Sequence, residues 1–580
     1  MCGISGIAGT NIQKDQLKAM LNLQHHRGPD DHGVYVNNSG TIGLAHNRLS
    51  IIDLSSAGHQ PMADRDERYR LVFNGEIYNY IELRKQLEPD FTFTTKTDSE
   101  VIINAYIKWG EDCLHKFIGM FAFAIWDERE KTLWAARDRL GIKPFNYAYD
   151  TTRNFLFASE IKTLHGAGIL KEPNEKVWAS YLVHGSYGAP EDTFWESIFQ
   201  LPAGHSLTWK DGRTWVKKWY DLSAITGSGY DARSLEEVTE EYFSILQDSI
   251  KLRFRADVPV GINISGGLDS SALLHLVTKV QGKDNQVKAF TFYTGDDRYD
   301  ELPWVQEMIA QTRHKLVPCL LAVEEVPALT ESVNANQDEP YGGIPTLAYA
   351  KLFEEARKNG IIVLLDGQGM DEQWAGYDYY RNAATSMASP VVQGTTDSPV
   401  RPGCLDPDFA GLALKQQFPE PYPDKLRNLQ FRDTFYTKIP RALRFNDRIS
   451  MRASTELREP FLDHRLFELA FRQSPDRKIQ GDQGKWFMRQ LLQTKLPGKI
   501  VEAPKRAMQT PQREWLRGPL KSWVEDTLAN TLKNNNWLVK DKITAEWNSF
   551  LKGESDNSFY IWQWMSLSMI TEGQQKVYNV

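Results

Sequence analysis

The sequence predicts a two-domain protein: an α+β layered domain, followed by an α/β domain with a parallel sheet and a helical C-terminal region. Up to about Leu201, short segments of alternating apolar and polar residues are separated by tight polar turns, which is typical of antiparallel strands. From about Ser234, strands alternate with helices, which is typical of a doubly wound sheet that binds ligands at the carboxyl ends of its strands. We therefore expect domains over residues 1–210 and 236–580, with a linker over 211–235, where turn formers and small polar residues predominate.

The first domain contains several segments with the strand pattern. They are GTIGLAHNRLSIID, RYRLVFNGEIYNY, GMFAFAIWDERE and KTLWAARD. A helix is expected from Asp98 to Trp109, between the second and third of them.

The second domain begins its alternation with the buried strand VPVGINIS, which the helix SSALLHLVTKV follows. KAFTFY and IIVLLDG are further strands, and a helix from Thr346 to Lys358 precedes the latter. Residues 389–424, rich in Pro, Gly and Ser, are expected to form a surface loop or insertion. Beyond Phe431 the pattern is mostly helical.

Composition and charge exclude several classes of protein. The chain has 580 residues, a formal net charge of -7 and a pI near 6.0, which argues against a general nucleic-acid binder. It has no run of roughly 18 apolar residues and no N-terminal secretion signal. The four cysteines lie far apart and form no CxxC, so neither a disulfide framework nor a zinc site is expected. We expect a soluble cytoplasmic protein that binds neither nucleic acid nor membrane.

Cys2 is the first candidate for chemistry. Removal of Met1, which a small second residue permits, would leave a thiol and a free α-amine on one residue. An α-amine has a pKa of roughly 7.7–8.0, so it can accept the thiol proton near neutral pH. The nucleophile would then carry its own general base. The alternative for Cys2 alone is a small residue near the chain start with no special role.

The motifs that follow Cys2 separate these alternatives. HHRGPDDHG, LAHNRLSIID, FNGEIYN and TDSE occur in order, and together with Cys2 they resemble the glutaminase domain of N-terminal-nucleophile amidotransferases. The resemblance covers about the first 200 residues. It implies an oxyanion hole made by the Asn74 side chain and the Gly75 N–H.

The same resemblance implies a glutamine pocket. Arg48 can supply a fork of donors to the glutamine carboxylate, whereas the alternative for Arg48 and Asp98 is a surface ion pair. Glu76 and Asp98 match the positions that accept from the glutamine ammonium. The implied pocket comprises Arg48, Leu49, Ser50, Ile51, Ile52, Asn74, Gly75, Glu76 and Asp98.

A second motif, ISGGLDSS at residues 264–271, joins the strand VPVGIN to the helix SALLHL. Gly266 and Gly267 let backbone N–H groups approach a phosphate, and the helix N-terminus adds partial positive charge. The motif is neither a Walker A sequence nor GxGxxG. SGGLDSS resembles the pyrophosphate loop of ATP pyrophosphatases, which split ATP to AMP and pyrophosphate, and Asp269 lies where a magnesium ligand is expected.

Further blocks complete the resemblance to the asparagine synthetase family. VLLDGQGMDEQWAGY supplies Asp371 as the second magnesium carboxylate, with Asp366 and Gly367 at nucleotide-contacting positions. NDRISMRASTELREPFLDHRL and GDQGKWFMRQLL match the C-terminal helical region, and Lys485 matches the catalytic lysine, although a solvated helix lysine is the alternative. The implied ATP site comprises Ile264, Ser265, Gly266, Gly267, Leu268, Asp269, Ser270, Ser271, Phe292, Asp366 and Gly367.

The resemblance implies a function and leaves its acceptor open. Glutamine would supply ammonia at Cys2, and ATP with Mg²⁺ would activate a carboxylic acid, with aspartate favoured. Gln368 stands at a catalytic position where the family usually has Glu, and Asp366 where it commonly has Ser. The alternative is the same chemistry on another acid, such as a sugar acid or a biosynthetic intermediate. Whether the chain forms a homodimer is left open.

Other classes fit less well. SGGLDSS separates the chain from amidotransferases with sugar-isomerase or phosphoribosyltransferase domains, and Cys2 separates it from β-lactam-forming cyclases. A binding protein with inactive sites is disfavoured because Cys2, Asp269, Asp371 and Lys485 are all present.

Overall fold

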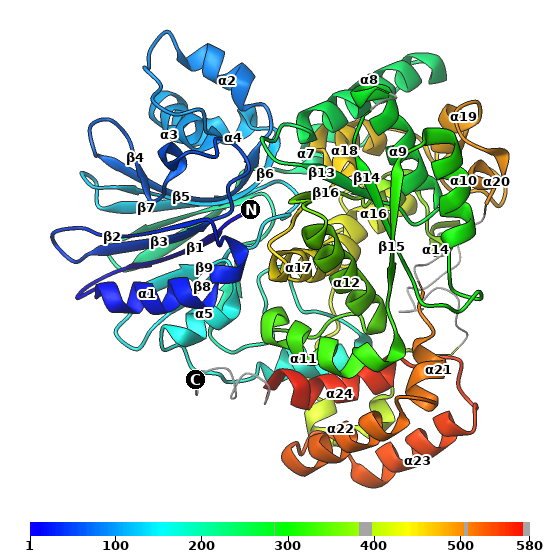
Figure 1. The fold of residues 1–580 in the computed structure, drawn as a ribbon. Helices are drawn as coiled ribbons and strands as arrows, with labels where there is room; N and C mark the ends of the chain where they lie inside the picture. Colours follow the sequence, from blue (N-terminus) through cyan, green and yellow to red (C-terminus); the bar gives the residue numbers. More distant parts are fainter. Residues whose placement is uncertain (283–284, 382–396, 504–508, 572–580) are drawn as a thin grey trace.

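The computed structural model describes residues 1–282, 285–381, 397–503 and 509–571 (Figure 1). An N-terminal domain built around two antiparallel sheets lies beside a C-terminal domain built around a parallel sheet. Both parts of the predicted fold class are therefore confirmed. Among the described helices, none is both long enough and apolar enough to cross a membrane.

Two facing sheets form the N-terminal domain, each with six strands among the described residues. The first has the order β10-β8-β9-β1-β3-β2, with β1 Gly3–Ala8, β2 Asp31–Val36, β3 Ile42–Arg48, β8 Asn146–Tyr149, β9 Phe155–Ala158 and β10 Ile198–Gln200. The second has the order β12-β11-β7-β6-β5-β4, with β4 Met62–Ala63, β5 Tyr69–Ile77, β6 Gly119–Asp127, β7 Thr132–Arg137, β11 His205–Lys210 and β12 Arg213–Lys218.

Apolar residues on the inner faces join the two sheets. Ile4 and Leu44 from the first sheet pack in one cluster with Val72 and Ala124 from the second. Helices cover the outer faces, so the domain has four layers, α-β-β-α (Figure 1). These helices, together with those near the domain boundary, are α1 Lys14–Leu23, α2 Tyr80–Leu87, α3 Asp98–Trp109, α4 Cys113–Lys116, α5 Ile161–Gly166, α6 Glu175–His184 and α7 Leu222–Thr226.

The segment predicted as a linker, 211–235, is partly regular structure. Asp211 and Gly212, with φ of 50° and 74°, form a two-residue turn between β11 and β12. β12 pairs with β11 from Arg213 to Lys218 and forms the edge of the second sheet. The prediction was therefore wrong for residues 211–218, because an Asp-Gly pair between two extended segments is a hairpin signal.

The C-terminal domain has a parallel sheet of five strands within the described residues, in the order β15-β14-β13-β16-β17. The strands are β13 Val260–Asn263, β14 Lys288–Tyr293, β15 Lys315–Leu320, β16 Val363–Leu365 and β17 Glu456–Arg458. Helices pack on both faces, as a parallel sheet requires. They include α8 Leu235–Arg253, α9 Leu268–Gln281, α10 Leu302–Thr312, α11 Val326–Gln337, α12 Ile344–Lys358, α13 Met370–Trp374, α14 Asp378–Arg381, α16 Lys425–Phe435 and α17 Lys438–Arg452.

The helical C-terminal region is confirmed. Its described helices are α18 His464–Phe471, α19 Trp486–Leu492, α20 Gly498–Val501, α21 Gln512–Arg517, α22 Lys521–Asn534, α23 Lys540–Leu551 and α24 Phe559–Thr571. Of the predicted loop over 389–424, residues 389–396 lie outside the described chain. Residues 397–424 are mainly irregular, with the short helix α15 Pro407–Ala410.

Candidate active sites

Cys2 directly precedes β1, a central strand of the first sheet, and faces Asn74 of β5 in the second sheet. The Cys2 backbone N–H donates to Asn74 Oδ1 at 3.1 Å. Met1 precedes Cys2 in the structure, and its ammonium lies 2.8 Å from Glu456 Oε2. Burial raises the pKa of the Cys2 thiol, and the positive N-terminus opposes that effect.

One of the two donors predicted for the oxyanion hole, the Asn74 side-chain amide, is unused in the described part of the structure. Asn74 Nδ2 is buried and has no hydrogen-bond partner among the described residues. Gly75 has a φ of +151°, and a Cβ there would lie 2.1 Å from the Met120 carbonyl oxygen, so only glycine fits. A fixed, unused amide donor beside the thiol can stabilise an oxyanion on a carbonyl attacked by Cys2.

The two predicted acceptors for the glutamine ammonium are buried near this point. Burial raises the pKa of Asp98 to about 6, and Asp98 Oδ2 accepts from the Ile77 N–H at 2.9 Å. The pKa of Glu76 is raised well above its usual range, first by burial and then by Glu456. A bound ammonium group would favour the charged form of both carboxyls.

The remaining predicted glutamine-binding residues lie at or in the loop that follows β3. The Arg48 guanidinium donates to the carbonyls of Ser55, at 2.7 Å, and Asp53, so in this structure it holds the loop. Leu49, Ile51 and Ile52 are buried in one cluster with Met1, and the Ser50 N–H donates to Asp30 Oδ2. Glutamine binding by Arg48 and these neighbours stays a prediction.

The second site lies at the carboxyl ends of β13 and β16, where α9 begins. Gly266 has a φ of +71°, and Gly267 is the N-cap of the 14-residue helix α9. Ser270 Oγ accepts from the Ser265 N–H at 3.1 Å and so holds the loop in its turn. The N–H groups at this helix N-terminus are therefore placed where they can bind a phosphate.

The other predicted nucleotide residues surround this loop. Asn263 Nδ2 donates to Asp366 Oδ2 at 2.9 Å, and a Cβ on Gly367 would lie 3.0 Å from the Ser270 nitrogen. The other residues predicted to bind the nucleotide follow β13 or lie on β14. They are Ile264, Leu268 and Ser271, which are buried, and Phe292, which packs near the Tyr349 ring.

Three charged residues converge at the phosphate loop. Lys485 Nζ lies 2.6 Å from both Asp269 Oδ1 and Asp371 Oδ1, although the three residues come from separate parts of the chain. Two carboxylates beside a phosphate loop suit Mg²⁺, which takes one or two carboxylates together with phosphate oxygens. No group of three or more His, Cys, Asp or Glu side chains that could hold a metal occurs in the described ranges, so substrate oxygens would have to complete such a site.

Gln368 precedes Asp371 by three residues in the sequence and contacts α17. Its Oε1 accepts from Asn446 Nδ2 at 3.1 Å. Burial raises the pKa of the nearby Glu372 to about 7, and Glu372 Oε1 accepts from the Tyr377 hydroxyl at 2.7 Å.

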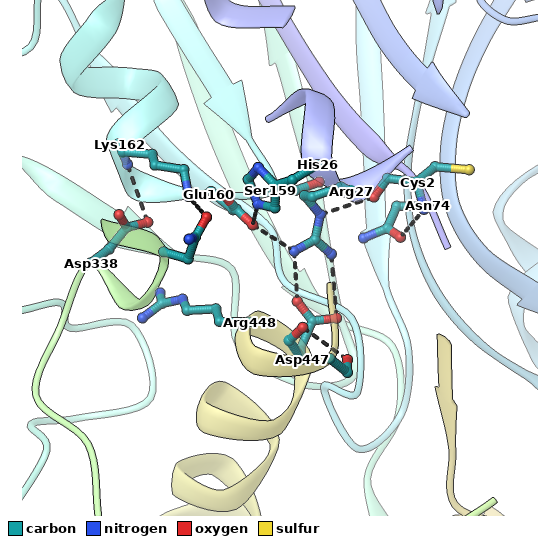
Figure 2. Close-up of polar contacts among 12 residues, drawn as sticks. Cys2, His26, Arg27, Asn74, Ser159, Glu160, Lys162, Asp338, Asp447 and Arg448 are labelled. Carbon is teal, nitrogen blue, oxygen red and sulfur yellow. Dashed lines mark hydrogen bonds and ion pairs between the residues drawn. The ribbon is translucent and has the colours of Figure 1, made fainter. Parts of the chain in front are cut away.

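A buried network that sequence reasoning missed connects the two domains (Figure 2). Arg27 Nε donates to the Cys2 carbonyl at 3.0 Å, and its Nη1 lies 2.9 Å from both Glu160 Oε1 and Asp447 Oδ2. Asp447 belongs to α17, next in sequence to Asn446. HHRG and NDR contain these residues, but a separation of 420 positions gives no sequence signal that they meet.

Comparison with protein families shows a two-domain, glutamine-dependent amidotransferase. Residues 1–220 match the model of the glutamine amidotransferase domain, and residues 241–572 match that of asparagine synthase. The chain belongs to the asparagine synthase family.

Relatives of nearly full length carry more than one name. The chain is 30% identical to Asparagine synthetase (glutamine-hydrolyzing) 3 of Bacillus subtilis, over 95% of this chain and 94% of the relative. It is 28% identical to Asparagine synthetase (glutamine-hydrolyzing) 1 of the same organism, over 97% and 95%. It is 29% identical to Amidase chyE of Penicillium rubens, over 95% and 94%.

Proposed function

We propose that this enzyme converts L-aspartate to L-asparagine, using ammonia from glutamine and activating aspartate as an acyl-adenylate. One observation supports this most: the chain combines a buried Cys2–Asn74 pair with a phosphate loop where Asp269, Asp371 and Lys485 converge. The first site suits amide cleavage and the second suits adenylation.

In the first step the Cys2 thiolate attacks the side-chain carbonyl carbon of glutamine. Asn74 Nδ2 and the Gly75 N–H donate to the oxyanion that forms. The α-amine that Met1 removal exposes takes the thiol proton and passes it to the departing ammonia. Water then hydrolyses the thioester and releases glutamate.

In the second step a carboxylate oxygen of the acceptor attacks the α-phosphorus of ATP, and pyrophosphate leaves. The N–H groups at the start of α9 bind phosphate oxygens, and Lys485 neutralises charge on them. Asp269 and Asp371 would hold Mg²⁺, which when bound neutralises the pyrophosphate. Ammonia then attacks the acyl carbon and displaces AMP.

A second candidate function is the same chemistry on another carboxylic acid. Gln368 supports it, because its neutral amide, fixed by Asn446, replaces the carboxylate that the resemblance predicts. The name of the amidase relative also fits an acceptor other than aspartate.

The decisive experiment incubates the enzyme with glutamine, ATP, Mg²⁺ and one acid at a time. With aspartate we expect asparagine, glutamate, AMP and pyrophosphate in equal amounts. ADP and phosphate as products would contradict adenylation. Amide formation from another acid, and none from aspartate, would establish the second candidate.

Gln368→Glu tests the acceptor pocket. If aspartate is the substrate, the change should preserve or raise asparagine formation, because it restores the family residue. In a pocket built for another acid, the new carboxylate would be unpaired. Such a charge costs several kcal/mol and would lower kcat by orders of magnitude. Gln368→Ala is the matched control, since it removes the amide without adding charge.

A further inference from the structure

A buried carboxyl group, Glu459, has no role in the steps above. It directly follows β17 and is 2% exposed. Its Oε2 is buried without a hydrogen-bond partner in the described part of the chain. Leaving a buried polar atom unsatisfied destabilises the folded state, so a carboxyl kept in this state calls for a functional explanation.

The strand register places Glu459 at the nucleotide-binding edge of the sheet. β16 and β17 are parallel, with Leu364 opposite Leu457, and the Asp366 N–H donates to the Arg458 carbonyl at 2.9 Å. Two residues further along each strand, Asp366 therefore lies opposite Glu459. Side chains alternate between the two faces along a strand. Asp366 and Glu459 therefore project from the same face of the sheet as Leu364 and Leu457, which pack together in one hydrophobic cluster.

Charged groups from both domains act electrostatically on Glu459. They are Lys143 after β7, Arg253 at the end of α8, Asp366 after β16 and Asp447 on α17. Lys143 Nζ lies 3.9 Å from Asp447 Oδ1, and Asp447 holds the Arg27 side chain that contacts the Cys2 carbonyl (Figure 2). Glu459 thus lies where the domain interface that leads to Cys2 meets the adenylation site.

This environment also tunes the acidity of Glu459. Burial raises its pKa to about 8, with Asp366 and Asp447 adding to the effect, while Lys143 and Arg253 oppose it. A general base works best when its pKa lies near the working pH. A carboxyl that both releases and accepts a proton in this range meets that condition.

We propose that Glu459 is the proton acceptor of the amide-forming step. The inference rests on the proposed function. The ammonia nitrogen attacks the acyl carbon of the adenylate, and the acyl C–O bond to AMP breaks with its electron pair passing to AMP. One N–H proton passes to the Glu459 carboxylate, which later releases it to solvent. The products are the amide, AMP and one proton.

The test compares Glu459→Gln with the unmodified enzyme, using aspartate, MgATP and ammonium chloride, so that Cys2 is not required. We expect asparagine formation to fall by about 10²–10⁴-fold. Glutamine hydrolysis and aspartate-dependent ATP–pyrophosphate exchange should stay within about twofold, since neither uses this base. The ratio of unmodified to variant rate should increase as pH rises through about 8. Taking a ratio at each pH cancels the protonation of ammonia itself.

Two further variants separate catalysis from structure. Glu459→Asp should restore part of the rate and of the pH dependence. Glu468→Gln is the matched control, because burial also raises the pKa of Glu468, which accepts from Tyr220 at 3.2 Å away from this edge. An equal loss of all reactions in Glu459→Gln, or a rate ratio independent of pH, would overturn the inference.

Failure of the proposed function has a different signature. If the unmodified enzyme forms no asparagine, the function fails, and the inference fails with it whatever the variants do. If the unmodified enzyme forms asparagine and Glu459→Gln forms it equally fast, only the inference fails.

Discussion

Asn74 serves Cys2 with both ends of its side-chain amide. The Cys2 nitrogen is a donor, so the amide oxygen must face it, which leaves Nδ2 pointing to the reacting carbonyl. Once Met1 is removed, the same hydrogen bond can hold the α-amine and leave its lone pair for the thiol proton. In the proposed mechanism, a single residue would thus position the general base and supply an oxyanion donor.

Cys2→Ala should separate the two half-reactions. Glutamine hydrolysis should fall below about one-thousandth of its normal rate, since the nucleophile is lost. Ammonia-dependent amidation should continue, because the second site needs only ammonia. Glutamate release and amide formation are measured in parallel, with Cys404→Ala as a control cysteine far along the chain. Unchanged glutamine hydrolysis in Cys2→Ala would refute the nucleophile assignment.

An extension at the N-terminus tests the role of the α-amine. With Met1 attached, the Cys2 nitrogen is part of a peptide bond. The free ammonium group then belongs to Met1 and contacts Glu456. A chain that retains Met1 or carries a tag before it should be a poor glutaminase, because the thiol lacks its base. Mass spectrometry of the N-terminus, combined with glutaminase rates, checks this expectation. Full glutaminase activity in the extended chain would contradict it.

At the scale of elements, the phosphate loop shows why strand ends carry the chemistry. β13 and β16 are neighbours in the parallel sheet, so Asp269 after one and Asp371 after the other approach the same point. Lys485 reaches them from the start of α19, where its φ of 55° is unusual for a residue with a side chain. The positive Lys485 side chain stabilises the charges of both carboxylates.

Asp371→Asn should impair adenylation and spare glutamine hydrolysis. The change removes one of two carboxylates that would hold Mg²⁺, so aspartate-dependent pyrophosphate release should fall by about 10²-fold or more. Raising the Mg²⁺ concentration should restore part of the rate. Asp378→Asn, at the start of α14 and outside the Lys485 cluster, is the matched control. Normal pyrophosphate release in Asp371→Asn would remove this residue from the site.

The sequence predicted those elements whose signal is local. The α3 helix spans the expected residues, and the strands around ISGGLDSS lie where the apolar runs indicated. α12 begins earlier than expected, at Ile344, because Gly343, with a φ of 86°, and Pro345 form its start. β12 lies within the predicted linker because the turn formers at 211–212 make a hairpin turn between two extended segments.

At the scale of the whole molecule, α17 links the two sites. Asn446 contacts Gln368 at the proposed adenylation site, while the adjacent Asp447 binds Arg27, which contacts Cys2 (Figure 2). Glu456 and Arg458 likewise extend from the second domain to the first, with Arg458 3.4 Å from Glu76. These contacts could not be predicted, because they depend on how two domains pack. Each sequence motif contains only one of the two residues that form such an interdomain contact.

Asp447→Asn should weaken the coupling between the sites. Asparagine keeps the shape but removes the charge that faces Arg27, which retains Glu160 as its partner. The lost charge-assisted bonds are worth about 1–3 kcal/mol. Glutamine-dependent synthesis should therefore fall by about tenfold. Ammonia-dependent synthesis should fall less, because it does not need the Cys2 site.

The informative measurement is the amount of glutamate released per asparagine formed. It should rise above one in Asp447→Asn, because ammonia escapes where the interface between the domains is loosened. Lys217→Gln, which removes an exposed ion pair with Glu111, is the control and should change neither rate nor ratio. A ratio that stays at one, with both rates reduced equally, would show that Asp447 supports only the fold. A raised ratio with normal thermal stability would assign to α17 the transfer of ammonia between the two sites.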